Sequence, residues 1–208
     1  MPTDICKICF KPIQITSIAT FLFKNLTVCE PCFDMFCPIY ESFIFEGVSA
    51  YAVYHYDDFI KEKLYLLKGC HDYELKDIFF DRQQHLLRFK YAGYTIVPIP
   101  SWAPDDEARG FNHVEAIFSH LKLPMLKILF KTRKHKQSDL SYSKRLEVKN
   151  LFMITDVDIS KKNILLVDDV MTSGSSLRAC LSLIKSKRPQ KIKILLLSKT
   201  KPPDKSLY

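Results

Sequence analysis

No apolar stretch in this sequence approaches the ~18 residues that a membrane-spanning helix needs, and no secretory leader opens it. The N-terminus, Met-Pro-Thr-Asp-Ile-Cys, lacks both the basic start and the apolar core of a signal peptide. These absences predict a cytoplasmic protein without a membrane span. In that compartment, cysteines serve metal binding or core packing more often than disulfides.

Glycine and acidic residues are also few. The chain has five glycines, so a glycine inside a motif needs an explanation. Its 23 Asp and Glu are outnumbered by 31 Lys and Arg, and the excess is uneven: residues 1–121 carry a net charge of −5 and residues 122–208 carry +13. A basic C-terminal part indicates an anionic partner, such as phosphates or nucleic acid, although a solvated lysine-rich surface would explain the charge equally well.

Cysteine is concentrated near the N-terminus, where four prolines interrupt any long element. The motifs Cys6-x-x-Cys9 and Cys29-x-x-Cys32 form two pairs separated by 19 residues. Two such pairs bind one tetrahedral Zn²⁺ through four thiolates and leave no open coordination position, so the predicted zinc is structural. The alternative is a set of free, buried cysteines. We therefore expect a zinc-binding module at residues 1–42, followed by a second domain at 43–208.

The second domain alternates predicted strands with predicted helices. Apolar and β-branched runs predict strands at 51–56, 94–102, 125–130, 164–167 and 191–197. Helical periodicity predicts helices within 57–90 (with a break near 69–72), over 111–121 and from 177 to 188. Residues 41–50 read as a connector and residues 103–110 as a polar loop. This alternation predicts an α/β fold, a parallel sheet flanked by helices.

The segment "ILLVDDVMTSGSSL" (164–177) joins a buried strand to a helix through two acids and a hydroxyl-rich turn. Backbone N–H groups at a helix start bind anions, and Gly174 lets the backbone approach a phosphate. The carboxylates of Asp168 and Asp169 would repel a phosphate, but they suit the hydroxyls of an attached sugar or a Mg²⁺. The predicted ribose-phosphate site comprises these acids and the turn Thr172, Ser173, Gly174, Ser175 and Ser176.

This thirteen-residue pattern (164–176) resembles the signature of type I phosphoribosyltransferases, with Ser173, Ser175 and Ser176 at positions where that family commonly has threonine. The resemblance implies binding of phosphoribosyl pyrophosphate (PRPP) together with Mg²⁺. "VPIPS" (97–101) is similar to the family's pyrophosphate loop, which implicates Pro100 and Ser101.

Further motifs resemble the ComF family of late competence proteins. "ARGFNH" (108–113) is similar to its Arg-Gly-Phe-Asn-Gln motif and implicates Arg109, although His113 stands in place of glutamine and Asp106-Glu107 where a basic residue is frequent. "QSDLSYSKRLEVKNLF" (137–152) resembles the stretch after that family's mobile loop. The resemblance implies handling of single-stranded DNA during natural transformation, beside a helicase-like translocase, ComFA.

Two functions remain open from the sequence. In the first, the protein is a phosphoribosyltransferase, and Lys131, Arg133 or Lys134 stabilises the departing pyrophosphate; no acceptor base is identifiable. In the second, which the ComF resemblance favours, the basic segment binds the phosphates of single-stranded DNA while Tyr142 or His135 stacks on bases. The predicted DNA-binding residues are Arg133, Lys134, Lys136, Lys144 and Arg145.

Overall fold

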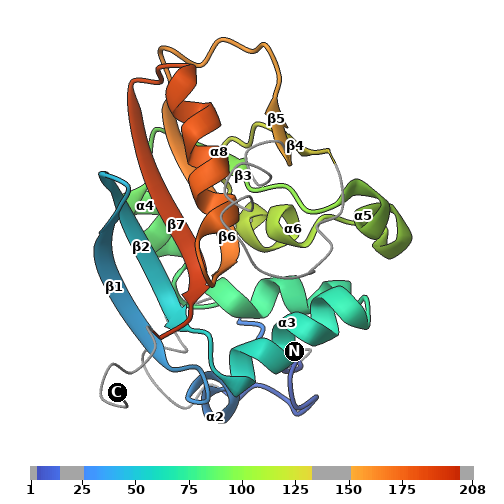
Figure 1. The fold of residues 1–208 in the computed structure, drawn as a ribbon. Coiled ribbons are helices and arrows are strands. Elements are labelled where there is room, and N and C mark those ends of the chain that lie inside the picture. Colours follow the sequence, from blue (N-terminus) through green and yellow to red (C-terminus); the bar gives the residue numbers. More distant parts are fainter. Residues whose placement is uncertain (1–3, 15–25, 133–150, 202–208) are drawn as a thin grey trace, which may run out of the picture.

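The computed structural model describes residues 4–14, 26–132 and 151–201. Its main feature is a five-stranded sheet in the order β1-β2-β7-β6-β3 (Figure 1). Strands β2 (Val48–His55), β7 (Lys191–Lys199), β6 (Asn163–Met171) and β3 (Tyr94–Pro98) run parallel, and β1 (Pro38–Phe45) pairs antiparallel with β2 at one edge. The predicted α/β fold with a largely parallel sheet is confirmed.

Helices cover both faces of this sheet and create two cores. One face packs against α3 (Asp58–Gly69), the 3₁₀ helix η1 (Tyr73–Phe80), α4 (Gln84–Lys90) and α6 (His113–Ser119). The other face packs against α8 (Ser175–Ser186) and a small antiparallel pair, β4 (Leu129–Lys131) and β5 (Phe152–Ile154). Figure 1 shows α8 crossing β6 and β7. In the described parts of the chain, no helix is long and apolar enough to cross a bilayer.

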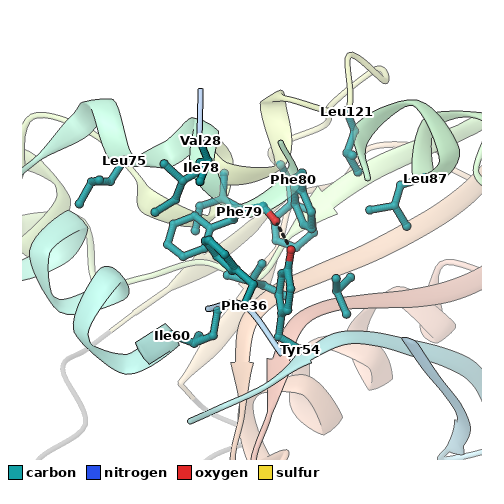
Figure 2. Packing of buried hydrophobic residues seen from close by; sticks show 14 of the residues in the cluster. Val28, Phe36, Tyr54, Ile60, Leu75, Ile78, Phe79, Phe80, Leu87 and Leu121 are labelled. Carbon is teal, nitrogen blue, oxygen red and sulfur yellow. Dashed lines mark hydrogen bonds between the residues drawn. The ribbon is translucent and has the colours of Figure 1, made fainter. Parts of the chain in front are cut away.

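The N-terminal segment contributes to the first of these cores. Cys6 and Val28 are fully buried there, and Phe36, which follows the short helix α2 (Glu30–Phe33), packs edge-on against Phe59 at 4.9 Å between ring centroids. Figure 2 shows Phe36 beside Tyr54, whose hydroxyl donates to the carbonyl of Phe79 at 2.9 Å. The predicted boundary between residues 42 and 43 lies inside strand β1.

Polar contacts also join the N-terminal segment to η1. The ammonium of Lys7, which lies between the first two cysteines, pairs with Glu74 at 2.6 Å and with Asp77 at 2.7 Å. Thr27 donates to the buried carboxylate of Asp81 from both its amide and its hydroxyl, each at 2.7 Å. The cysteine-containing segment is therefore fixed to the rest of the molecule by charge as well as by apolar packing.

Two sequence predictions of irregular structure were wrong. Residues 41–50, expected as a connector, form most of the β1–β2 hairpin, whose turn is Glu46-Gly47, both at positive φ. Residues 103–109, expected as a loop, form helix α5 (Ala103–Arg109), which Gly110 ends in a left-handed conformation. The strand predicted at 94–102 ends earlier, at Pro98, as β3. Of the strand predicted at 125–130, only Leu129 and Phe130 belong to β4, which continues to Lys131.

Candidate functional site

Asp168 and Asp169 lie inside strand β6, which continues to Met171. Asp168 pairs in register with Leu196, and the carbonyl of Asp169 accepts a hydrogen bond from the Ser198 hydroxyl at 3.0 Å. The two side chains alternate across the sheet, as neighbouring residues of a strand must. Asp169 is 6% exposed and Asp168 is half-buried.

The carboxylate of Asp169 contacts a lysine and a histidine from different helices. The ammonium of Lys68, in the last turn of α3, forms an ion pair with it, and Nε2 of His113 lies 3.3 Å from its Oδ2. Burial alone would raise the pKa of Asp169, but Lys68 and His113 outweigh burial and hold that pKa well below its usual range. Burial and the adjacent Asp169 raise the pKa of Asp168 well above the usual value. The pair therefore separates into one ionised and one readily protonated carboxyl.

Arg109 connects this ion pair to helix α5. Its Nε donates to the backbone carbonyl of Lys68 at 2.9 Å, and its Nη1 pairs with Asp106 at 2.9 Å. The same Nη1 lies 3.2 Å from Nδ1 of His113. The guanidinium side chain is 10% exposed. Two of the three guanidinium nitrogens of Arg109, Nε and Nη1, therefore contact protein groups that include Lys68 and His113.

Ser101, in the loop after β3, belongs to the same network. Its hydroxyl donates to Asp106 at 2.6 Å, and Nδ2 of Asn112 donates to Ser101 Oγ and to Asp106, both at 2.8 Å. The loop that begins at Pro100, which is half-buried, is thereby tied to the start of α6, where Asn112 caps the helix by accepting from the Glu115 amide. The structure brings the predicted loop and the predicted Arg109 into one connected set of side chains.

The hydroxyl-rich turn precedes a twelve-residue helix. Thr172 and Ser173 are exposed, Ser175 and Ser176 are half-buried, and the hydroxyls of Ser173 and Ser175 lie 3.0 Å apart. Gly174 caps α8 with φ of +70°, and a Cβ there would lie 2.9 Å from the ring of Phe45. Only glycine fits, because the conformation and the close ring both exclude a side chain. The first turn of α8 contains no acidic residue, so its N–H groups and the nearby hydroxyls suit an anion.

The predicted basic residues are only partly described. Lys131, at the end of β4, is half-buried with its ammonium 5.9 Å from the ring centroid of Phe152 in β5. Arg133, Lys134, Lys136, Lys144 and Arg145 lie outside the described residues, as do His135 and Tyr142. Strands β4 and β5 bracket that segment, and the Thr132 amide donates to the Leu151 carbonyl at 2.8 Å.

The sequence gives no indication that Lys68 and Asn112 belong to this site. It marks Asp106 and His113 only as differences from the ComF motif. No local pattern distinguishes Lys68 from the other lysines of α3, because its partner Asp169 lies a hundred positions away in the chain. Asp106 was noted for its charge, which opposes anion binding. The structure shows that this charge is neutralised internally by Arg109.

The four N-terminal cysteines converge on one point. Their Sγ atoms all lie within 4.8 Å of one another, and those of Cys9 and Cys29 are 3.6 Å apart. A tetrahedral metal with ~2.3 Å bonds to sulfur separates its ligands by about 3.8 Å, so this donor set fits a metal ion. Burial opposes ionisation of Cys6, but backbone N–H groups of Cys29, Cys9 and Ile8 lower its pKa to about 7.

Sequence comparison finds a phosphoribosyl transferase domain at residues 107–206. The competence protein ComFC of Streptococcus pneumoniae is 30% identical over 152 residues, which cover 73% of this chain and 68% of that protein. ComFC of Bacillus subtilis is 27% identical over 175 residues, which cover 83% and 68%. A hypoxanthine phosphoribosyltransferase from Staphylococcus aureus matches in structure with a TM-score of 0.39 and 12% identity, over 63% of this chain and 75% of that one.

Replacing Lys68 with glutamine should destabilise the protein by about 3 kcal/mol at pH 7, because it removes the main cation beside a buried, ionised Asp169. The pKa of Asp169 is depressed in the folded state, so the pair contributes fully above about pH 4 and loses its contribution as the pH falls through the lowered pKa. Urea unfolding of wild type and Lys68→Gln should therefore show a constant difference from pH 5 to 8 that narrows below pH 4. Lys61→Gln, an exposed lysine of the same helix, is the control and should change stability by less than about 0.5 kcal/mol.

Proposed function

The chain belongs to the ComFC family of competence proteins and has the type I phosphoribosyltransferase fold, and from this premise we propose that it binds single-stranded DNA during DNA uptake in natural transformation. We further propose that the site between β6, the Pro100-Ser101 loop and the start of α8 holds PRPP. The protein would act in the cytoplasm beside a ComFA-like translocase, with the cysteine module as the docking surface.

One observation carries the PRPP proposal: two neighbouring acids and a hydroxyl-rich helix start occupy the same end of β6. The turn 172–176 would bind the 5′-phosphate through the first N–H groups of α8 and the hydroxyls beside them. Within residues 4–14, 26–132 and 151–201 Asp168 forms no ion pair, so it would accept from the ribose hydroxyls or ligate a Mg²⁺. Asp169 is already neutralised by Lys68, which supports a positioning role for it in the ligand-free protein.

The pyrophosphate of PRPP would face the Pro100-Ser101 loop. Arg109 would face it with part of its guanidinium, because its Nη1 pairs with Asp106 and its Nε donates to the Lys68 carbonyl. The charge of Asp106 offsets that of Arg109, so further cations are needed. Cations for the pyrophosphate would therefore come from Mg²⁺, from Lys68, or from Lys131 and the basic segment that follows it. This requirement supports a role for Lys131, Arg133 and Lys134 near the ligand.

The second candidate function is phosphoribosyl transfer to a nitrogen nucleophile. The match of a phosphoribosyl transferase domain to residues 107–206 favours it, since these residues include both acids, Lys131 and the whole of α8. In that reaction the nucleophile would attack C1 of the ribose and the bond to pyrophosphate would break. Incubating the protein with PRPP and Mg²⁺ and screening nucleobases for pyrophosphate release separates the two candidates: release with any base makes the protein an enzyme.

For the metal, we propose one structural Zn²⁺ held by Cys6, Cys9, Cys29 and Cys32. Four sulfur ligands, three of them on buried cysteines and one on the partly buried Cys9, leave no position for a substrate. The ion would cross-link the two cysteine pairs and would take no part in chemistry at the PRPP site.

Asp168→Asn should weaken Mg²⁺-dependent PRPP binding at least tenfold, because it removes the acceptor proposed for the ribose hydroxyls or the metal. Isothermal titration calorimetry with and without Mg²⁺ measures the effect. Asp156→Asn, which changes a fully exposed acid that pairs with Lys187, is the matched control and should bind like wild type. Unchanged affinity in Asp168→Asn would refute the ribose assignment.

Metal analysis of protein purified without chelators should find one zinc per chain. Cys6→Ser with Cys29→Ser should lose it, because each pair would retain a single thiolate. Cys37→Ser changes an exposed cysteine outside the cluster and should keep the full zinc content. Less than one zinc in wild type, or equal loss in the Cys37 variant, would contradict the four-cysteine site.

Single-stranded DNA binding should weaken as salt rises, and replacing Arg133, Lys134 and Lys136 with glutamine should lower the slope of log affinity against log salt by about 2. Each contact with a single strand contributes roughly 0.7 to that slope because bound cations release counterions. Fluorescence anisotropy with an oligo-dT probe measures it. A triple variant of exposed lysines elsewhere, Lys11, Lys61 and Lys122 to glutamine, removes the same charge and should keep the wild-type slope.

A further inference from the structure

On one face of the sheet, the region where the parallel strands β2 and β7 begin is exposed to solvent. On β1 and β2, Ser42, Ile44 and Ser49 point to the face that α3, η1 and α4 cover further along, yet all three are exposed, Ile44 at 71%. On the opposite face, their chain neighbours Val48 and Ala50 are buried against the core of α8. The sheet is therefore covered on one side and open on the other at the same strand positions.

Lysines and tyrosines border this open region. Lys90, the last residue of α4, places its ammonium 3.1 Å from the ring centroid of Tyr51 in β2. Lys193 of β7 places its ammonium 5.3 Å from the ring centroid of Tyr94 and 5.9 Å from that of Tyr91. Register places Lys193 beside Ser49, because Ala50 pairs with Ile194.

These cations have no acidic partner in residues 4–14, 26–132 and 151–201. Lys90, Lys191 and Lys193 form no ion pair there, whereas Lys199, at the other end of β7, pairs with Glu41. Burial and the neighbouring Lys193 both lower the pKa of Lys90, as expected for like charges held close together. Two ammonium groups in mutual repulsion favour the approach of an anion.

Helix α4, which ends at Lys90, also carries exposed apolar side chains. Phe89 of α4 is 83% exposed, and Leu86, one turn earlier on the same side of the helix, is 63% exposed. A solvated lysine-rich face would explain the charges alone, but it does not explain the almost fully exposed ring of Phe89 on the helix that ends at Lys90. Cations together with an exposed aromatic ring suit a polymer with charged phosphates and flat bases.

We propose that the surface formed by Tyr51, Phe89, Lys90, Lys191 and Lys193, here called the lysine–aromatic surface, is a second contact site for single-stranded DNA. The proposal rests on the proposed DNA-binding function but uses none of residues 131–145. Lys90, Lys191 and Lys193 would bind phosphates, and Phe89 would stack on a base. An acidic protein is the competing partner, because it would satisfy the same charges without needing the ring.

The position of this surface separates it from the PRPP site. Asp168 and the turn 172–176 lie at the carboxyl end of β6, whereas Lys191 and Lys193 lie at the beginning of the neighbouring parallel strand β7. Since parallel strands begin at one edge of a sheet and end at the other, the two sites lie at opposite edges. DNA on the lysine–aromatic surface would therefore not compete with PRPP.

The test uses the full-length protein, an oligo-dT 30-mer and anisotropy titrations over a range of salt. Lys90→Gln with Lys193→Gln should lower the salt slope by about 1.4, and Phe89→Ala should weaken binding roughly tenfold, while Phe89→Trp retains the affinity because it restores a stacking ring. Lys61→Gln with Lys122→Gln removes the same charge from exposed positions elsewhere and should behave like wild type. Circular dichroism checks that each variant is folded.

Three results would overturn the proposal in distinguishable ways. If wild type binds oligo-dT but the surface variants match the control, the lysine–aromatic surface is not a DNA site and the proposed function stands. If wild type does not bind oligo-dT at all, the proposed function fails as well. If the variants lose binding of polyglutamate but not of oligo-dT, the surface binds acidic protein. Bromodeoxyuridine cross-links that map to Phe89 or Tyr51 would support it directly.

Discussion

A buried, ionised carboxylate governs how this molecule is assembled. Asp169 is almost inaccessible to solvent, so its charge must be balanced within the protein, and the side chains that contact it come from helices that are distant in sequence. Lys68 approaches from α3 and His113 from α6, and Arg109 of α5 contacts both of them. One charge in strand β6 thereby fixes the arrangement of three helices around the end of the sheet.

As a consequence, the two adjacent acids Asp168 and Asp169 differ in their ionisation and in their roles. Asp169, held ionised by Lys68 and His113, supports the architecture. Asp168, on the other side of the strand, has a raised pKa, which a bound cation would lower again. The proposed binding of a metal or of ribose at Asp168 would therefore be coupled to its ionisation. The hydroxyl-rich turn adds anion-binding groups without adding charge, so the site suits a ligand that carries both phosphate and sugar.

The sequence predicted what depends on local chemistry. The run "ILLV" identified a buried strand, the two C-x-x-C pairs identified residues that do converge, and Pro189 lies where α8 has ended. The errors at 41–50 and 103–109 arose from signals that were present but misread: Glu46-Gly47 is a two-residue hairpin turn, and Ala103-Pro104-Asp105-Asp106 is a favourable helix start. Lys68 and the lysine–aromatic surface were not predictable, because each depends on strands and helices that meet only in three dimensions.

Phe36 shows why the first forty residues are more than an attachment. Its ring fills space between Phe33, Tyr54 and Phe59, so it completes the same apolar layer that supports η1 and α3. Removing residues 1–42 would cut the edge strand β1 and expose that apolar layer to water. A shortened chain for crystallisation or for an activity assay would need to keep the cysteine-containing segment, because Phe36 packs against Phe59 of α3, the helix that carries Lys68.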